Sequence, residues 1–379
     1  MIYALTRRAN AFGIGDYLST DGADIRGLVT LLSYEQVFDD GRLPIGAYLF
    51  AGLDQITATE LEMVTRAREA LASASPSTPR FNDPLRWRPR LALLRAAVDG
   101  GFNNFRATRA TDRDRHRRFP VFIRSELEHT GSLSPLLFDQ PSVTRALVRA
   151  LLDGYRLRDL LIIEYSDTSV DGVFTKYSAM ALGSRIVPRA VATSREWVTK
   201  HGGSDSNREA ADRDLRYVEG NPHEAWVRRV FEIGGVDYGR IDYALVNGAP
   251  QVWEINTNPT IGANLALEES SAKNAPLAPG GADDSLYYKE RGNRLFYQKF
   301  GRAIQDLSET TKVAMAADGV GSKPVRIAIS SAERRRISRE RIERERVLAR
   351  ATMVTRIAAP MLAGYRAIRR AVGPARAGY

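Results

Sequence analysis

The residues most suited to chemistry lie in one stretch, from Val236 to Gly262, which reads VDYGRIDYALVNGAPQVWEINTNPTIG. Apolar and polar residues alternate on both sides of Asn247-Gly248, a dipeptide that is typical of tight turns between strands. Because successive side chains of a strand point to opposite faces, the pattern predicts a β-hairpin with one apolar and one polar face.

The polar face of this hairpin would bring four side chains together. With a three-residue loop from Asn247 to Ala249, Asp242 lies opposite Glu254 and Arg240 lies opposite Asn256. A two-residue loop without a bulge would place the two carboxylates on different faces, because a slip of one residue turns every side chain over. We therefore predict the three-residue loop, or a bulge that has the same effect on the register.

Two carboxylates and an amide oxygen on one face repel each other and lose hydration unless something compensates them. Mg²⁺ is a hard cation that takes oxygen ligands, keeps some of its waters and commonly shares its site with substrate phosphates. The stretch therefore predicts a Mg²⁺–nucleotide site. The alternative is a surface hairpin whose polar face is solvated.

The segments Arg240-Ile-Asp242 and Glu254-Ile-Asn256-Thr-Asn-Pro259 resemble the metal-binding end of the ATP-grasp superfamily, especially D-alanine–D-alanine ligases and glutathione synthetase-like carboxylate–amine ligases. The resemblance covers roughly residues 80 to 305. It implies that Asp242, Glu254 and Asn256 hold two Mg²⁺ ions on the phosphates of ATP. It also implies that Arg240 faces the transferred phosphate and the developing oxyanion.

The resemblance implies an α/β (α+β) chain with the ATP-grasp fold. Such a chain has an N-terminal open α/β domain that helps to hold the second substrate, a small lid, and a main domain with an antiparallel sheet and the metal site. We expect the N-terminal domain over residues 1–104, the lid over 105–165, the main domain over 166–310 and a basic helical tail over 311–379.

The N-terminal part of the chain alternates strand and helix signals, which is typical of a small open α/β domain. Thr57 and Glu60 have the spacing of a capping box, which marks the start of a helix. We expect a strand at Met1–Thr6, a compact apolar run at Ile45–Phe50, and helices at Ala23–Phe38, Thr57–Ala72 and Trp87–Val98.

The segment Phe105–Arg118 is rich in arginine, and we interpret it as a solvated linker, with anion steering as the alternative. Pro120–Arg124 reads as a strand that ends in a cation, and Glu128–Ser132 as a tight turn whose backbone N–H groups could cradle phosphate. The superfamily usually has lysine where Arg124 falls, followed by a longer glycine-rich loop. Arginine also donates to phosphate, with a different geometry. Ser142–Leu152 has the pattern of an amphipathic helix.

Leu160–Tyr165 reads as a buried strand that ends in a polar pair. In the superfamily this strand end joins the lid to the main domain. The resemblance therefore implies that backbone groups around Glu164 and Tyr165 contact the adenine, and that Glu164 or Asp167 binds the ribose. The alternative is a strand end that emerges into solvent.

Val173–Leu182 and Arg185–Thr193 predict a second hairpin. Lys176 lies in mid-strand on the same face as two apolar residues, and a lysine there is uncommon unless it is paired or faces a ligand. The resemblance implies that Lys176 contacts phosphate and that Arg189 is a second cation. Both residues could instead be charges on an edge strand.

The rest of the main domain is less informative. Trp197–Glu219 is polar, and we expect an irregular loop there. Backbone N–H groups of Thr260–Gly262 could face the reacting carboxylate. We expect helices at Pro222–Gly234 and Tyr287–Leu307 and a loop at Pro276–Asp284.

The net charge of +10 is unevenly distributed over the 379 residues. Residues 330–379 contain 13 Arg and 4 Glu, a net charge of +9, which leaves +1 for residues 1–329. A nearly neutral body does not favour nucleic-acid binding. The absence of Cys excludes disulfides and thiolate chemistry and fits a reducing, cytoplasmic location, and the four His residues lack zinc-ligand spacing. We expect no signal peptide and no membrane-spanning segment.

The basic tail predicts two helices. Residues 332–350 are rich in Arg and Glu, and apolar residues from Val354 to Val372 recur at helical spacing beside several arginines. Such a basic amphipathic helix could lie on an anionic membrane surface, dock on the body of the protein or dock on a second subunit. We expect that removal of the residues beyond about Ser330 leaves nucleotide binding intact.

The reaction that fits these residues best is an ATP-dependent ligation. ATP phosphorylates a carboxylate to an acyl phosphate, and an amine or another nucleophile then displaces the phosphate. Both substrates would be small molecules or peptides. Two alternatives use the same residues. One is a phosphotransferase that leaves the phosphoryl group on a hydroxyl, and the other is a non-catalytic nucleotide-binding protein tethered by its tail.

Overall fold

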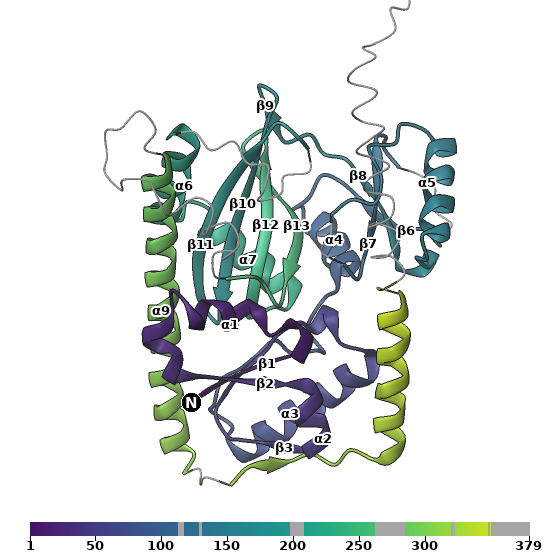
Figure 1. The fold of residues 1–379 in the computed structure, drawn as a ribbon. Coiled ribbons are helices and arrows are strands. Elements are labelled where there is room, and N and C mark those ends of the chain that lie inside the picture. The colour runs from purple at the N-terminus through teal and green to yellow at the C-terminus, as the bar shows by residue number, and fades with distance from the viewer. Residues whose placement is uncertain are drawn as a thin grey trace, which may run out of the picture.

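The computed structural model of the chain describes residues 1–112, 117–128, 131–197, 208–261, 285–319, 321, 323–347 and 349. Figure 1 shows a parallel sheet in the lower part of the molecule, an antiparallel sheet above it, and a small lid with its own sheet at the side. The long helix α9 (Ser285–Ala317) runs along both the lower and the upper part. The expected architecture of an open N-terminal α/β domain, a lid and an antiparallel main domain is confirmed.

The N-terminal domain is built on a four-stranded parallel sheet in the order β2-β1-β4-β5. The chain passes from β1 to β2 on one side and then crosses to β4 on the other side. The loops after β1 and β4 therefore leave the same edge of the sheet side by side, which is where open α/β sheets bind ligands. The strands are β1 (Ile2–Thr6), β2 (Val29–Ser33), β4 (Ala47–Phe50) and β5 (Arg80–Phe81).

Helices cover both faces of this sheet. Ile2 and Ala4 of β1 belong to a core that includes Phe296 of α9, whereas Leu5 packs with Met63 and other residues of the opposite face. The helices of the domain are α1 (Phe12–Ser19) on the first face, and α2 (Tyr34–Asp40) and α3 (Ala58–Ala74) on the second.

The capping box predicted for α3 is confirmed. Thr57 Oγ1 accepts a hydrogen bond from the backbone N–H of Glu60 at 3.2 Å, and Glu60 Oε2 accepts one from the backbone N–H of Thr57 at 2.8 Å. Glu60 is fully buried, so its carboxylate also requires a cationic partner.

The helix expected at Ala23–Phe38 is wrong. The segment folds as a 3-10 helix (Ala23–Leu28), the strand β2 and the helix α2. The apolar residues of this segment lie three to five positions apart, a spacing that does not distinguish one long helix from a series of shorter elements. The edge of β1 supplies backbone hydrogen-bond partners, which favour a strand at β2. The pattern also fails to predict α1, because two glycines lower the helix propensity of its eight residues.

The lid has a three-stranded antiparallel sheet in the order β6-β8-β7, with the expected helix α5 (Gln140–Leu152) packed on it. The linker expected at Phe105–Arg118 is wrong in part, because Phe105 is buried and the next residues form an edge strand paired with β8. The strands are β6 (Ala107–Arg109), β7 (Val121–Ser125) and β8 (Leu160–Glu164).

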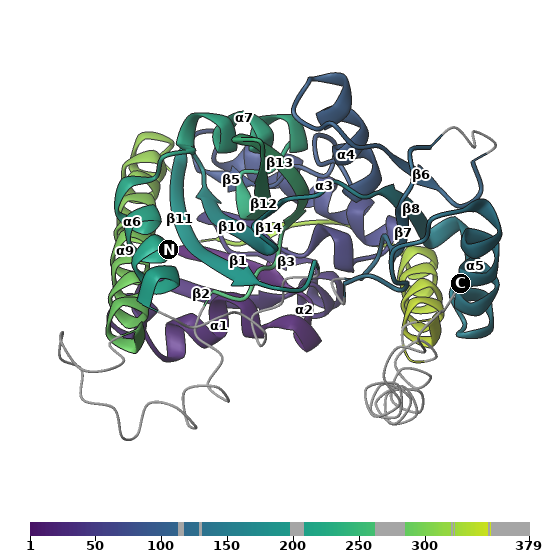
Figure 2. The same ribbon diagram turned by 90° about the horizontal axis from the view of Figure 1, so that it is seen from above.

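The main domain has an antiparallel sheet in the order β11-β10-β12-β13, and β9 (Ser169–Val170) pairs with the start of β10. Figure 2 shows α7 (Glu224–Gly234) against one face of this sheet and α6 (Arg208–Gly220) and α9 beside β11. α4 (Arg90–Asp99) packs near β13. The strands are β10 (Val173–Leu182), β11 (Arg185–Ser194), β12 (Tyr238–Val246) and β13 (Ala249–Asn256).

The irregular loop expected at Trp197–Glu219 is wrong from residue 208 onward. Ala211, Leu215 and Val218 recur at helical spacing and are buried, so α6 packs an apolar stripe on the sheet despite its polar composition. The helices expected at Pro222–Gly234 and Tyr287–Leu307 correspond to α7 and to the N-terminal part of the longer α9.

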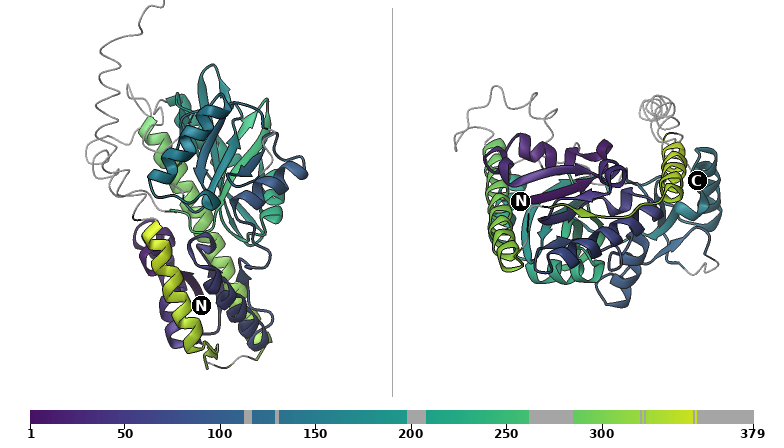
Figure 3. Two further views of the ribbon diagram at one scale, coloured as in Figure 1. Left: turned by 90° about the vertical axis from the view of Figure 1, so that its right-hand side faces the viewer. Right: turned by 90° about the horizontal axis from the view of Figure 1, so that it is seen from below.

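The chain returns to the N-terminal domain after α9. β14 (Val325–Arg326) pairs with β3 (Arg42–Leu43), and a helix over residues 331–347 follows. Figures 1 and 3 show this helix in yellow beside the N-terminal domain and next to the lid. Ile327 and Ile337 are buried in the core formed with α2 and α3. As far as residue 347, the expected tail is therefore part of the folded body.

Several expected features fall at least partly outside the described residues. They are the turn at Glu128–Ser132, the end of Thr260–Gly262, the loop at Pro276–Asp284 and the amphipathic segment from Val354 to Val372. Among the helices that the structure describes, none is both long enough and apolar enough to cross a membrane.

Candidate active site

The hairpin of β12 and β13 carries the predicted carboxylate pair. Backbone pairing places Asp242 opposite Glu254 and Arg240 opposite Asn256, as the sequence predicts. The four side chains therefore start from neighbouring positions on one face of the hairpin.

The three-residue loop is wrong, and the predicted alternative of a bulge is confirmed. Val246 pairs with Ala249, so the turn contains only Asn247 and Gly248, which have φ angles of 50° and 80°. The register then shifts by one residue, because Trp253 is inserted between two paired positions. This bulge keeps the two carboxylates on the same face.

Asp242 is held between two cations and is only 8% exposed. Its Oδ1 accepts a hydrogen bond from Nε of Arg240 at 3.1 Å, and its Oδ2 accepts one from Nζ of Lys176 at 3.3 Å. Lys176 lies on β10, the strand next to β12. The lysine that the sequence places on an apolar face therefore has a charged partner in the site.

Glu254 connects the hairpin to the lid and to α4. Its Oε2 accepts a hydrogen bond from Nη2 of Arg124 at 2.6 Å and is also hydrogen-bonded to Arg90. The side chains of Arg124 and Arg90 are 12% and 5% exposed. Burial lowers the pKa of Arg124 to about 10, and the charge of Glu254 opposes this shift.

Arg90 is the candidate functional residue that sequence reasoning missed. It is the first residue of α4, and its Nη1 donates to the carbonyl oxygens of Ser125 at 2.7 Å and Glu128 at 2.9 Å. One guanidinium therefore joins the end of the lid strand β7 to Glu254. The local signal is an arginine between Pro89 and an apolar residue, which is also typical of a solvated helix start.

The cluster carries more positive than negative charge. Among the residues that the structure describes, two carboxylates pair with four cationic side chains, which gives these six groups a net charge of +2, and the cations come from α4, β7, β10 and β12. In a partly buried site such an excess attracts anions strongly. The arrangement is suited to a polyphosphate, which carries several negative charges. The cationic residues are Arg90, Arg124, Lys176 and Arg240.

The oxygen donors of the cluster fit a hard divalent cation. Asp242 and Glu254 supply carboxylates, and Asn256 supplies an amide oxygen that accepts a hydrogen bond from the backbone N–H of Asn258 at 2.8 Å. In the described ranges no group of three or more His, Cys, Asp or Glu side chains could hold a metal. Mg²⁺ needs only one or two carboxylates where phosphate and water complete its shell, so these residues suit a metal that arrives with a nucleotide.

Glu164, which is predicted to bind ribose, lies at the end of β8 and is buried. Its carboxylate accepts hydrogen bonds from the backbone N–H groups of Arg106 at 3.0 Å and Arg118 at 2.7 Å. These contacts tie together the two segments that flank β8. The side chain of Glu164 therefore stabilises the lid in this conformation.

Tyr165 and Asp167 follow at the same end of the strand. Tyr165 Oη donates to Asp167 Oδ1 at 3.2 Å, and Asp167 also accepts hydrogen bonds from the backbone N–H and the hydroxyl of Ser169 at 2.9 and 2.8 Å. The hydrogen bonds from Ser169 lower the pKa of Asp167, and burial raises the pKa of Tyr165 to about 12. These contacts are local and do not join the Asp242–Glu254 cluster.

Arg189 is held by α9 rather than by the carboxylate pair. Its guanidinium lies over the rings of Phe296, at 4.6 Å, and Tyr297, at 5.5 Å, and its Nη1 donates to Oδ1 of Asn293 at 2.8 Å. Burial lowers the pKa of Arg189. The nearby carboxylate of Asp214 accepts a hydrogen bond from the backbone N–H of Val191 at 2.5 Å, and burial raises its pKa to about 6.

The loop that follows β13 is fastened to the N-terminal domain by Thr257, which is fully buried. Its carbonyl oxygen accepts a hydrogen bond from the backbone N–H of Gly52 at 3.1 Å. Its hydroxyl accepts one from the backbone N–H of Leu53 at 3.0 Å and donates to Oδ1 of Asp54 at 2.8 Å. The loop after β4 therefore supports the residue next to Asn256.

Asn258 fastens the same loop a second time. Its Nδ2 donates to the carbonyl oxygen of Asn10, in the loop after β1, at 2.9 Å. Gly13 of α1 packs so closely that an added Cβ would lie 2.7 Å from Oδ1 of Asn258. Both loops at the crossing point of the parallel sheet thus contact the loop that begins at Asn256. In the same loop, the carbonyl oxygen of Thr260 accepts a hydrogen bond from Nη1 of Arg240 at 3.3 Å.

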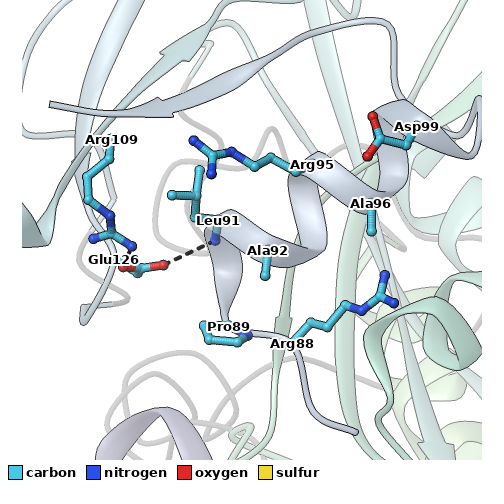
Figure 4. A pocket seen from close by; sticks show the side chains of 9 residues that line it. All are labelled: Arg88, Pro89, Leu91, Ala92, Arg95, Ala96, Asp99, Arg109 and Glu126. Carbon is cyan, nitrogen blue, oxygen red and sulfur yellow. Dashed lines mark hydrogen bonds and ion pairs between the residues drawn. The ribbon is translucent and has the colours of Figure 1, made fainter. Parts of the chain in front are cut away.

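A cavity of about 490 Å³ opens beside α4, as Figure 4 shows. In it, the carboxylate of Glu126 accepts a hydrogen bond from the backbone N–H of Leu91 at 3.3 Å and pairs with Arg109 at 2.6 Å. No residue of the carboxylate cluster lines this cavity, so it is separate from the candidate site. The lining residues are Arg88, Pro89, Leu91, Ala92, Arg95, Ala96, Asp99, Arg109 and Glu126.

No protein-family model matches the sequence, and no curated protein matches it. The structure is similar to D-alanine–D-alanine ligase from Bacillus anthracis complexed with ATP, with 10% identity, coverage of 84% of this chain and 98% of that chain, and a TM-score of 0.44. It is also similar to a RimK domain ATP-grasp protein from Sphaerobacter thermophilus, with 16% identity, coverage of 76% and 98%, and a TM-score of 0.38. A third similar structure is the ATP-grasp ligase PsnB complexed with a phosphomimetic variant of its minimal precursor, Mg and ADP, with 10% identity, coverage of 78% and 97%, and a TM-score of 0.40. Two of these three solved structures are described as ATP-grasp proteins, the superfamily that the motifs of this chain resemble.

Proposed function

We propose that this chain is an ATP-dependent carboxylate–amine ligase. The observation that carries the proposal is the cluster around Asp242 and Glu254, in which four cations from separate elements surround two paired carboxylates. A purely structural ion-pair cluster would need no excess of positive charge, whereas a site for the triphosphate of ATP does.

The residues divide into three roles in this proposal. Asp242, Glu254 and Asn256 would hold Mg²⁺, with two ions, as the resemblance to the ATP-grasp superfamily implies. Arg124, Arg90 and Lys176 would orient the phosphates, and the adenine would lie toward the end of β8 near Tyr165. Arg240 would face the reacting carboxylate, and Arg189 would add a positive charge farther along the sheet. When bound, Mg²⁺ neutralises phosphate charge and aligns the nucleotide.

The proposed reaction has two steps. A carboxylate oxygen of the first substrate attacks the γ-phosphorus of ATP, the bond to the bridging oxygen breaks, and ADP leaves. The amine nitrogen of the second substrate then attacks the acyl carbon, the bond to the phosphate oxygen breaks, and phosphate leaves while the nitrogen loses a proton. Arg240 stabilises the negative charge that develops on the acyl oxygen.

The lid contributes to the site through Arg124, and Arg90 fixes the end of the same strand. An acyl phosphate is destroyed by water, so a ligase must enclose it until the amine attacks. Contacts between lid strand β7 and Glu254 of the hairpin would bring the lid over the nucleotide. The second substrate would enter beside the loops after β1 and β4, which meet the loop at Asn256.

The experiment that tests the proposal is a calorimetric titration of ATP with and without Mg²⁺. We expect Mg²⁺-dependent binding by the wild type, and a loss of at least about tenfold in affinity for Asp242→Asn in the presence of Mg²⁺. Glu232→Gln removes one negative charge from an exposed residue of α7, as Asp242→Asn does in the site, and this control variant should bind ATP like the wild type. Equal Mg²⁺-dependent affinity in Asp242→Asn and the wild type would overturn the assignment of the metal site.

The type of reaction is tested by the products. A panel of amino acids, peptides and hydroxy acids is offered with ATP and Mg²⁺, and both ADP and free phosphate are measured. A ligase releases one phosphate for each ADP only when the carboxylate and the amine are both present. ADP formed without free phosphate would instead identify a phosphotransferase and contradict the ligase proposal.

A further inference from the structure

The helix over residues 331–347 ends close to the loops that support the candidate site. We propose that this helix positions the site, with Arg344 as a positioning residue that acts through Asp54 and Thr257 on the loop carrying Asn256. The inference rests on the proposed function for its effect on Mg²⁺ and nucleotide. The structural coupling itself can be measured without either ligand.

The helix is firmly anchored on the N-terminal domain. The guanidinium of Arg341 donates to the fully buried carboxylate of Glu60, with Nε 2.7 Å from Oε1. The carboxylate of Glu340 accepts hydrogen bonds from the backbone N–H of Thr59 at 3.1 Å and from its hydroxyl at 2.9 Å, at the start of α3. Ile337 is 4% exposed. A buried ion pair, a contact to a helix start and an apolar anchor together fix the position of the helix.

Arg344 lies one turn beyond this anchor. Its Nη2 donates to the backbone carbonyl oxygen of Asp54 at 2.7 Å, and burial lowers the pKa of Arg344. Asp54 is the middle residue of the short 3-10 helix Leu53–Gln55, which follows β4. Gly52 precedes this helix with a φ of 66°, a conformation in which a side chain would be strained. The turn therefore has a special shape, and Arg344 holds it from one side.

Thr257 holds the same turn from the other side. Its hydroxyl bonds to Leu53 and Asp54, and its carbonyl oxygen bonds to Gly52. The next residue, Asn258, donates its backbone N–H to Oδ1 of Asn256. A path of hydrogen bonds and one peptide bond, between Thr257 and Asn258, thus runs from the helix over residues 331–347 through the turn after β4 to a proposed metal ligand.

The helix also contacts the lid, through an ion pair that is more exposed. Glu343 pairs with Arg156 at 3.1 Å, and the side chain of Glu343 is 59% exposed. Exposed ion pairs contribute little, typically less than about 1 kcal/mol. The path through Arg344 is more enclosed, so we place the positioning role there.

The first experiment measures hydrogen exchange of the free protein. Arg344→Met removes the hydrogen bond to Asp54 but keeps most of the side-chain stem, and Arg339→Met changes an exposed arginine of the same helix. We expect the amides of Gly52 and Leu53, which bond to Thr257, to exchange about three- to tenfold faster in Arg344→Met only. Amides inside α3 serve as an internal reference for global destabilisation. Unchanged exchange at both amides, or an equal increase throughout α3, would overturn the proposal.

The second experiment measures the Mg²⁺ dependence of ATP binding in the same variants. We expect a several-fold weaker Mg²⁺-dependent affinity in Arg344→Met, recovery in Arg344→Lys, and wild-type behaviour in Arg339→Met. Thr257→Val should reduce the affinity as well. If Arg344 acts through Thr257, the double variant loses less than the product of the two single effects. Independent, multiplicative effects would show that Arg344 does not act through Thr257.

The two experiments separate this inference from the proposed function. If the wild type binds no ATP in the presence of Mg²⁺, the proposed function fails, while the exchange at Gly52 and Leu53 still tests the coupling. If ATP binds as proposed and the exchange is unaffected by Arg344→Met, the proposed function stands and the positioning role of Arg344 fails.

Discussion

Glu254 receives hydrogen bonds from two largely buried arginines that lie on different elements, Arg90 on α4 and Arg124 on β7. A phosphate oxygen that enters the cluster can take over part of these bonds with little further desolvation of the arginines, because most of their surface is already removed from water. Preformed cationic sites of this kind bind anions with little reorganisation. In the proposed function, the paired state would prepare the site for the nucleotide.

Arg90→Met is therefore expected to weaken Mg²⁺–ATP binding by at least about tenfold, since charge-assisted hydrogen bonds contribute roughly 1.5–3 kcal/mol. Arg90→Lys should recover part of the affinity through its charge. Arg95→Met, an exposed change on the same helix, is the control. Calorimetry measures all three, and an affinity of Arg90→Met equal to that of Arg95→Met would exclude Arg90 from the site.

Asp214 predicts a pH dependence of stability. Burial raises its pKa from 3.8 to about 6 in the folded protein. The folded state thus binds the proton more tightly than the unfolded state, so the stability that this proton contributes is present at low pH and is lost as the pH rises through 6. The full effect is roughly 3 kcal/mol, of which about 1.4 kcal/mol is lost between pH 5 and pH 7.5.

Urea unfolding of the wild type and of Asp214→Asn at these two pH values measures the effect. The amide keeps an oxygen for the hydrogen bond from Val191 but does not titrate, so the variant should gain on the wild type by about 1.4 kcal/mol as the pH rises. A difference between the two proteins that does not change with pH would show that Asp214 is not the titrating group.

At the scale of residues, the sequence predicts the members of the site that share a hairpin, and the resemblance adds Arg124 and Lys176 from other strands, but Arg90 is missed. Asp242, Glu254 and Asn256 are readable because period-two alternation fixes their common face. Arg90 is not readable, because its distance from Glu254 is set by how α4 packs near β13. Burial likewise decides that Glu164 bonds to backbone amides of the lid, which its position at a strand end does not reveal.

At the scale of elements, the turn of the β12–β13 hairpin determines the register of the site. Gly248 has a φ of 80° and nothing within 4 Å of an added Cβ, so a side chain there meets backbone strain but no steric clash. We expect Gly248→Ala to lower the free energy of unfolding by about 1–2 kcal/mol. Gly27→Ala, at a glycine with equally open surroundings and no positive φ, should change it by much less. Chemical denaturation measures both, and equal effects would contradict the strain argument.

The elements that the sequence predicts correctly are those with a strong local signal, such as α3 with its capping box and the β10–β11 hairpin. The errors occur where tertiary partners decide. Ala23–Phe38 becomes a strand and two short helices because β1 offers a free edge. The bulge at Trp253 cannot be read directly from the alternation, which leaves open whether the loop has three residues or has two residues and a bulge. The ring of Trp253 stacks on Phe105, with the ring centroids 5.4 Å apart, and this contact joins residues far apart in the sequence.

At the scale of the whole molecule, the helix over residues 331–347 changes the expected result of truncation. The sequence predicts that a chain cut at about Ser330 keeps nucleotide binding, but this cut would leave Glu60 buried without Arg341. Breaking a buried ion pair in this way costs about 3–5 kcal/mol. We therefore expect a chain ending at 330 to unfold at a lower temperature and to bind Mg²⁺–ATP more weakly. A chain ending at 349 should keep both properties, and identical melting of the two truncated chains would contradict the docking of this helix.

The docking of the C-terminal helix also has a consequence for protein synthesis. The core around α2 and α3 contains Ile327 and Ile337, and the hydrogen bond from Thr59 to Glu340 spans 281 positions of the sequence. At typical translation rates, the ribosome needs roughly 15 seconds to one minute to add that many residues. During this interval the nascent N-terminal domain carries an uncovered apolar face and an unpaired Glu60. The N-terminal domain is thus completed only when the helix over residues 331–347 has been synthesised, and until then its uncovered apolar face is a surface that chaperones can bind.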